Sequence, residues 1–500
     1  MSPATYARLR MTDPDRWRTA ALAWRRWAAL AGALGAEFGP VAARLRAAWS
    51  GATASAVADA LVAFRRRIAL FRVLCWRADQ VLSEFASALA RARDLLLRAR
   101  GRAERCGLVI DDRGTVHGSS PERPGVVAEL SAALSLAATA DTEATTRLRS
   151  LVTAGSPGNT AGPSGDSAPM PRPDCTTPPA EVRRWWDHLS PDRRNWLLAT
   201  EPAALGSTAG IPAADRDVAN RLLLDDQRAA GVDEARARVE DGTVLRPYLM
   251  GLDVSGDGRA VIALGDPDRA RHVLTHVPGM TSDLESFGGE LTRAERVAVR
   301  AHEIAPGEAV SAVLWLDYDA PDFVHEAWSD RQAREGAEGL RRFQESLRVT
   351  HDGPPADQTV LGHSYGSLVV GAAAAGSFAA DRVVFVGSPG VGVDSAAQLS
   401  VPAWSTTSRS DVIQYAAVSP DSLVRDIVLA GRVPLIGPAI AFGLPEDDLW
   451  FGRNPSDPAF GARVFPSQAD AGHLGYWDPG RPALDALARI TAAQEPVTRP

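Results

Sequence analysis

The segment Gly362-His363-Ser364-Tyr365-Gly366 places a serine hydroxyl in a tight turn between two different local patterns. An apolar run with Val360 and Leu361 precedes the turn, and a small-residue helical pattern over 368–375 follows it. The flanking glycines leave room where a side chain would collide with a neighbouring strand or helix. The motif alone also fits an ordinary Gly/Ser turn, since the chain contains 43 Gly in 500 residues. The flanking strand and helix patterns favour a nucleophile elbow that exposes Ser364.

A serine becomes nucleophilic when a base and an orienting acid lie beside it. The elbow resembles that of the α/β hydrolases, in which Ser, then Asp or Glu, then His follow along the chain. Of nine His, only His473 comes after Ser364, in a Gly-flanked loop. Asp411 lies in a polar loop after a predicted strand, where this architecture keeps its functional groups, and is the preferred acid. Asp394, after the preceding strand, is the alternative.

These three residues predict acyl transfer through a covalent intermediate. His473 would take the proton of Ser364, while Asp411 would orient the imidazole and stabilise its charged form. The oxyanion would be held by two backbone N–H groups, those of Tyr365 and of Met280 in the loop after an early strand. The reaction requires no cofactor and no metal, and water releases the acyl group.

Eight short apolar segments alternate with helical patterns in the second half of the chain. The predicted strands cover residues 248–254, 260–264, 272–277, 309–316, 358–362, 382–386, 403–407 and 463–465. The predicted helices include residues 215–230, 284–303 and 330–347. Strands that alternate with helices predict a mostly parallel sheet covered on both faces, the α/β class.

The N-terminal part has a different, all-helical pattern. Apolar residues recur at alternating steps of four and three over 13–49, and again for about 40 residues from Val57 to Leu96. This periodicity predicts two long helices that fold back as an antiparallel hairpin, each apolar seam covering the other. A small β-hairpin over 106–118 and another helix over 121–152 are expected to follow.

The break between the two long helices is Trp49-Ser50-Gly51. A helical hairpin with this turn resembles the small Trp-x-Gly proteins exported by type VII secretion. Those proteins commonly carry a Tyr-x-x-x-acidic signal after the second helix, whereas this chain has no Tyr between Tyr6 and Tyr248. The resemblance implies either export by a type VII-like route or, in a cytoplasmic protein, a hairpin that serves docking to a protein partner or self-association.

The region from about Trp185 to Trp477 is similar to a branch of uncharacterised bacterial serine hydrolases within the α/β hydrolases. The similarity is carried by the elbow and by four further segments, 277–280, 316–321, 457–465 and 472–473. It implies the triad Ser364, Asp411 and His473 and no particular substrate. We therefore predict an esterase- or lipase-like serine hydrolase. A peptidase, amidase or acyltransferase with the same triad, or a non-catalytic secretion-associated binding or effector module, are the alternatives.

The composition of the chain predicts a domain boundary and argues against some classes of function. Residues 153–180 are rich in Gly, Pro, Ser and Thr, which predicts a linker between a helical domain (1–152) and a hydrolase domain (181–500). A net charge of −7 argues against nucleic-acid binding. We expect no general secretory signal peptide and no transmembrane segment, because no apolar run of sufficient length occurs. Residues 418–460 are expected to form either a lid or a helical excursion.

Overall fold

The structure is a computed structural model of the whole chain, and it describes residues 3–154, 172–224, 227, 231–240, 245–322, 329–415 and 448–496. Residues 155–171 of the predicted linker and 418–447 of the predicted lid lie outside the described residues.

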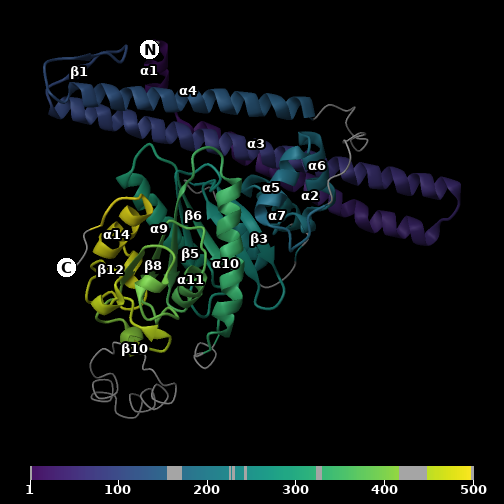
Figure 1. Cartoon of the computed structure of the whole chain (residues 1–500). Coiled ribbons are helices and arrows are strands. Elements are labelled where there is room, and N and C mark those ends of the chain that lie inside the picture. The colour runs from purple at the N-terminus through teal and green to yellow at the C-terminus, as the bar shows by residue number, and fades with distance from the viewer. Residues whose placement is uncertain are drawn as a thin grey trace.

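An eight-stranded sheet forms the centre of the second half of the chain (Figure 1). Its strand order is β12-β9-β8-β7-β5-β6-β4-β3. The strands are β3 (Pro247–Asp253), β4 (Arg259–Leu264), β5 (His272–Val277), β6 (Val310–Leu316), β7 (Asp357–His363), β8 (Arg382–Val386), β9 (Ala403–Thr406) and β12 (Arg463–Val464). All eight predicted strands are present. A separate small pair, β10 (Asp448–Leu449) and β11 (Gly452–Arg453), follows the undescribed segment.

The sheet is parallel except at one edge. Strands β6, β5, β7, β8, β9 and β12 run parallel to one another, whereas β4 is antiparallel to both β6 and β3. Because a strand between two parallel neighbours is covered on both faces, it reads as a nearly continuous apolar run. All the parallel strands end at the same edge, so the loops after β7, β9 and β12 meet there.

Successive side chains of each central strand enter two different cores. Val273, Val360 and Val383 pack with helices α10 (Arg331–Thr350) and α11 (Gly366–Ala374). Their chain neighbours Leu274, Leu361 and Val384 pack with α9 (Gly288–Ile304) and α14 (Pro482–Thr491). This alternation is the two-residue period of a strand, and it confirms the predicted sheet with helices on both faces (Figure 1).

The N-terminal part consists of long helices, as predicted. Helix α1 (Pro3–Met11) precedes the hairpin of α2 (Pro14–Ala48) and α3 (Ala52–Arg105), and α4 (Arg123–Ala154) lies along α3 (Figure 1). The short strands β1 (Val109–Ile110) and β2 (Val116–His117) form the expected hairpin between α3 and α4. With 54 residues, α3 extends about 80 Å, longer than the periodicity predicted.

The expectation that the two seams of the hairpin cover each other is only partly correct. Small seam residues, such as Ala21 and Ala28, are buried. Several aromatic ones are partly exposed, since Trp17 and Trp24 are 39% and 38% exposed and Phe71 is 43% exposed. The reason is that much of the apolar surface of α3 faces α4 and the rest of the chain instead of α2.

The hairpin shares a core with helices that lead into the sheet. These helices are α5 (Pro179–His188), α6 (Pro191–Thr200), α7 (Ala213–Leu224) and α8 (Val232–Glu240). Val73 and Trp76 of α3 pack in one cluster with Trp186 of α5, Leu198 of α6 and Val218 of α7. Cys75 of α3 is also fully buried. No described helix has both the length and the apolar character that a membrane span requires.

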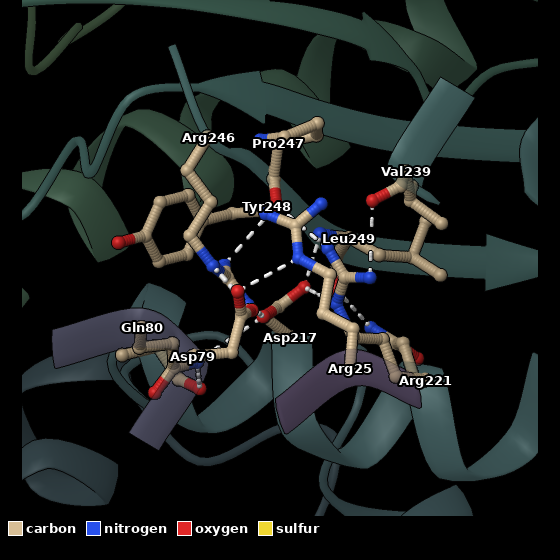
Figure 2. Close-up of polar contacts among 12 residues, drawn as sticks. Arg25, Asp79, Gln80, Asp217, Arg221, Val239, Arg246, Pro247, Tyr248 and Leu249 are labelled. Atoms are coloured by element: carbon tan, nitrogen blue, oxygen red, sulfur yellow. Dashed lines mark hydrogen bonds and ion pairs between the residues drawn. The ribbon is translucent and has the colours of Figure 1, made fainter. Parts of the chain in front are cut away.

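A buried network of ion pairs joins the hairpin to the sheet (Figure 2). Asp79 of α3 accepts hydrogen bonds from Arg25 Nε of α2 (2.7 Å) and from Arg246 Nη2, just before β3 (2.7 Å). Asp217 of α7 accepts from Arg246 Nη2 (2.8 Å) and Arg221 Nε (2.7 Å). Further guanidinium N–H groups donate to backbone carbonyl oxygens, so the excess positive charge is also hydrogen-bonded. The network fixes α3 at the edge where the parallel strands begin.

Candidate active site

Ser364 lies in a strained turn between β7 and α11. Its φ is 53°, a left-handed conformation that is rare for a residue with a side chain. Its N–H donates to the Val386 carbonyl oxygen of the neighbouring strand at 3.0 Å, which fixes the turn. A Cβ on Gly362 would lie 2.6 Å from the Ser367 Cα, and one on Gly366 would collide with the Val277 carbonyl oxygen. The two glycines therefore permit the tight strand-to-helix connection that the sequence indicates.

The acid and the base meet above the neighbouring strands. The Nδ1 atom of His473 lies 2.8 Å from Oδ1 and 3.0 Å from Oδ2 of Asp411, which is fully buried. Asp411 follows β9 and His473 follows β12, the next strand of the sheet. The alternative acid, Asp394, lies elsewhere and accepts a hydrogen bond from the Arg453 N–H of β11. The structure thus pairs His473 with Asp411 and not with Asp394.

Tyr476 positions the acid, and sequence reasoning missed this role. Its hydroxyl donates to Asp411 Oδ2 at 2.5 Å and accepts from the Ser408 N–H at 2.9 Å. Burial and the adjacent carboxylate raise the pKa of Tyr476, so the hydroxyl stays protonated and remains a donor. The Ile413 N–H also donates to Asp411 Oδ1. The only signal in the sequence was the position of Tyr476 three residues after His473, on the same loop.

The residue before the nucleophile supports the base. The rings of His363 and His473 lie 4.8 Å apart, and His363 Nε2 is 3.1 Å from the His473 carbonyl oxygen. Burial lowers the pKa of His363 to about 3, so the ring is neutral at physiological pH. Because a carbonyl oxygen only accepts, the neutral ring must carry its proton on Nε2. On its other side, the edge of His363 meets the ring of Trp477.

The predicted oxyanion residues flank the serine. A Cβ on Gly279 would lie 2.7 Å from the Ser364 Cβ and 3.2 Å from its Oγ, so the 278–280 loop passes directly beside the nucleophile. The Tyr318 hydroxyl donates to the Pro278 carbonyl oxygen at 2.6 Å and holds this loop. Among the described residues, the hydrogen bonds leave the N–H groups of Tyr365 and Met280 unused. Tyr365 and Met280 stay the predicted oxyanion donors.

Ser364 and His473 both lie at the end of β8, since the Ser364 N–H binds the Val386 carbonyl oxygen and a Cβ on Gly387 would lie 3.2 Å from His473 Nδ1. Within the described part of the chain, no hydrogen bond joins Ser364 Oγ to His473. Such bonds are commonly long in enzymes without substrate and tighten when substrate is bound. No group of three His, Cys, Asp or Glu side chains among the described residues is arranged to hold a metal ion. The arrangement offers a hydroxyl, a paired imidazole and two free amides, which is the set that acyl transfer uses.

Comparison with known proteins agrees with this architecture. Residues 253–421 match the family model described as "Alpha/beta hydrolase". The part of the chain that contains the eight-stranded sheet has the α/β-hydrolase fold. The matched region contains the elbow and Asp411 and ends before His473.

Similar proteins occur in mycobacteria. "Uncharacterized protein Rv2079" of Mycobacterium tuberculosis is 29% identical over 388 residues, which cover 65% of this chain and 57% of that protein. "Uncharacterized protein Rv0963c" of the same organism is 35% identical over 163 residues, 31% of this chain and 61% of that protein. "Uncharacterized protein Mb0988c" of Mycobacterium bovis matches to the same extent. The chain thus spans about three fifths of the length of these relatives.

Proposed function

We propose that this protein is a serine hydrolase that cleaves carboxylic esters through Ser364, His473 and Asp411. The observation that carries the proposal is the pair of Asp411 and His473, whose carboxylate and Nδ1 lie 2.8 Å apart beside a serine with a φ of 53°. An imidazole with its Nδ1–H bound to a buried carboxylate presents a basic Nε2, which is the state that a general base needs. The α/β-hydrolase fold supports the proposal.

The reaction would proceed in two halves. Nε2 of His473 accepts the Ser364 proton as Oγ attacks the ester carbonyl carbon, and the carbonyl oxygen becomes an oxyanion. The N–H groups of Tyr365 and Met280 would donate to that oxygen, and each such donor contributes about 3 kcal/mol to lowering the barrier. The imidazolium then protonates the leaving alcohol. A water molecule, deprotonated by the same imidazole, releases the acid and restores Ser364.

A fluorophosphonate probe tests the proposal, because it reacts covalently with activated serines. The wild-type chain should be labelled and Ser364→Ala should not, while Ser207→Ala, which removes an exposed hydroxyl, should be labelled like wild type. Hydrolysis of p-nitrophenyl esters of increasing acyl length then measures the ester preference. A folded wild-type protein without labelling, or labelling that persists in Ser364→Ala, would overturn the proposal.

A further inference from the structure

A cavity of about 210 Å³ lies where α3 and α4 meet the sheet. We call it the interface cavity. Its lining includes Glu84 and Arg91 of α3, Arg147 of α4, and Val310, the first residue of β6. Ser364 follows the end of β7, which runs parallel to β6 through β5. The interface cavity is therefore at the opposite edge of the sheet from the candidate active site, and the proposed hydrolysis does not use it.

Most charged groups of the interface cavity are paired with one another. Glu84 forms ion pairs with both Arg147 and Arg269, and Arg269 also pairs with Glu143 of α4. The Tyr248 hydroxyl donates to Glu84 Oε1 at 2.8 Å. Although burial acts against ionisation of Glu84, Arg147 and Arg269 lower its pKa, so Glu84 is ionised. Two carboxylates thus balance two guanidinium groups.

Arg91 is the exception. Its Nε is buried and has no hydrogen-bond partner among the described residues, while the side chain as a whole is partly exposed. Burial, together with the positive charge of Arg269, lowers the pKa of Arg91 to about 10, so the group is still charged at neutral pH. A guanidinium whose Nε is buried without a partner is unfavourable, and an anion beside it would remove that cost.

The remaining carboxyl group of the interface cavity does not supply that anion. Asp266 has no ion pair among the described residues, and its Oδ1 accepts only the Asp268 N–H. Burial and the neighbouring carboxylates Asp268 and Glu84 raise the pKa of Asp266 well above its ordinary value. A carboxyl group that resists ionisation in this way is a poor counter-charge for Arg91.

One wall of the interface cavity is apolar. Phe85 and Ala88 of α3, Leu136 and Ala140 of α4, and Val310 form this wall. The volume exceeds that of a single water, which occupies about 30 Å³ in the liquid. From the unpartnered Nε of Arg91 and the apolar wall together, we infer that the interface cavity binds a small organic carboxylate. Its charged group would pair with Arg91, and its short hydrocarbon tail would lie against Phe85 and Leu136.

Calorimetric titration of the full chain with sodium hexanoate tests this inference. Hexanoate should bind, and it should also raise the unfolding temperature, because it contacts the folded state alone. Hexanol, which has the same tail without the charge, and inorganic phosphate, which has charge without the tail, should bind at least about tenfold more weakly. Equal binding of hexanol, binding of phosphate alone, or no binding of hexanoate at millimolar concentrations would overturn the inference.

Three variants separate binding from folding. Arg91→Met should weaken hexanoate binding at least about tenfold without lowering the unfolding temperature of the ligand-free protein, because it removes a guanidinium whose buried Nε has no partner. Arg93→Met, on the same helix and outside the cavity lining, should bind hexanoate like wild type. Leu136→Trp should fill the apolar wall and weaken binding. Unchanged affinity in a folded Arg91→Met protein would contradict the proposed role of that guanidinium.

Discussion

The ring of His363 donates from Nε2 to the backbone carbonyl oxygen of His473 across 3.1 Å. The residue before the nucleophile thereby holds the loop that carries the base, 110 positions later in the chain. Asp411 holds the imidazole of His473 from one side, and His363 holds its backbone from another. The orientation of the base thus depends on two contacts that act on different parts of the same residue.

Replacing His363 should therefore impair turnover more than substrate binding. For His363→Phe we expect kcat to fall roughly tenfold to a hundredfold with little change in KM, because the base is displaced while the substrate surface is kept. His363→Asn, whose amide can still donate, should recover part of the loss. Rates of ester hydrolysis at saturating and at limiting substrate concentrations give the effects on kcat and KM separately. An equal rise in KM in both variants would point to a role in binding.

The depressed pKa of His363 predicts sensitivity to acid. Its native pKa of about 3 lies below the ordinary value, so the unfolded chain takes up a proton first as the pH falls. From this group alone, the free energy of unfolding should rise between about pH 3 and about pH 6.5, by at most about 1.4 kcal/mol per unit. Urea unfolding at several pH values measures the slope. His363→Gln should reduce it, whereas His188→Gln, at an exposed position, should not.

Replacing each candidate acid in turn tests which of the two acts with His473. Asp411→Asn should lower kcat by about 10⁴-fold, because the amide favours the wrong imidazole tautomer. Asp394→Asn should leave kcat unchanged, since its side chain contacts β11 and not His473. Tyr476→Phe should cause an intermediate loss, because it removes one donor to the carboxylate. Comparable losses in the Asp394 and Asp411 variants would contradict the assignment.

The loop beside the nucleophile should tolerate no added methyl group. Gly279→Ala would place a Cβ 2.7 Å from that of Ser364, and we expect about a hundredfold loss of ester hydrolysis in a folded protein. Gly289→Ala is the matched control, since a Cβ there meets nothing within 4 Å. That change lies in α9 and should raise the free energy of unfolding by up to about 1 kcal/mol. Full activity in Gly279→Ala would exclude a close approach of the two segments.

The buried network predicts a large effect at a single position of α3. Asp79→Ala would leave Arg25 and Arg246 without their shared carboxylate, and we expect a loss of about 3–5 kcal/mol in the free energy of unfolding. Asp59→Ala, at an exposed position of the same helix, should change it by no more than about 0.5 kcal/mol. Urea unfolding followed by circular dichroism compares the two. Similar stability of both variants would mean that the network contributes little.

Local pattern was sufficient to predict the strands and the elbow, because apolar runs, glycines and helical periodicity are encoded within a few residues. The order of Ser364, Asp411 and His473 along the chain led to residues that the structure brings to one edge of the sheet. Contacts between residues far apart in the sequence could not be predicted from local pattern. Asp79 and Arg246 are 167 positions apart, and the local sequence around either residue does not predict that the two form an ion pair. The exposure of Trp17 and Trp24 follows from the packing of α3 against α4 and the later helices, which periodicity does not reveal. The division of the chain at 153–180 and the role of the hairpin stay predictions.

The ion network fastens the long helices to the edge where the parallel strands begin, and the elbow opens at the edge where they end. Asp79 and its arginine partners therefore connect the hairpin, with its turn at Gly51, to the sheet. A tag or tether on the hairpin is therefore expected to leave the candidate active site accessible, because the two lie at opposite edges of the sheet.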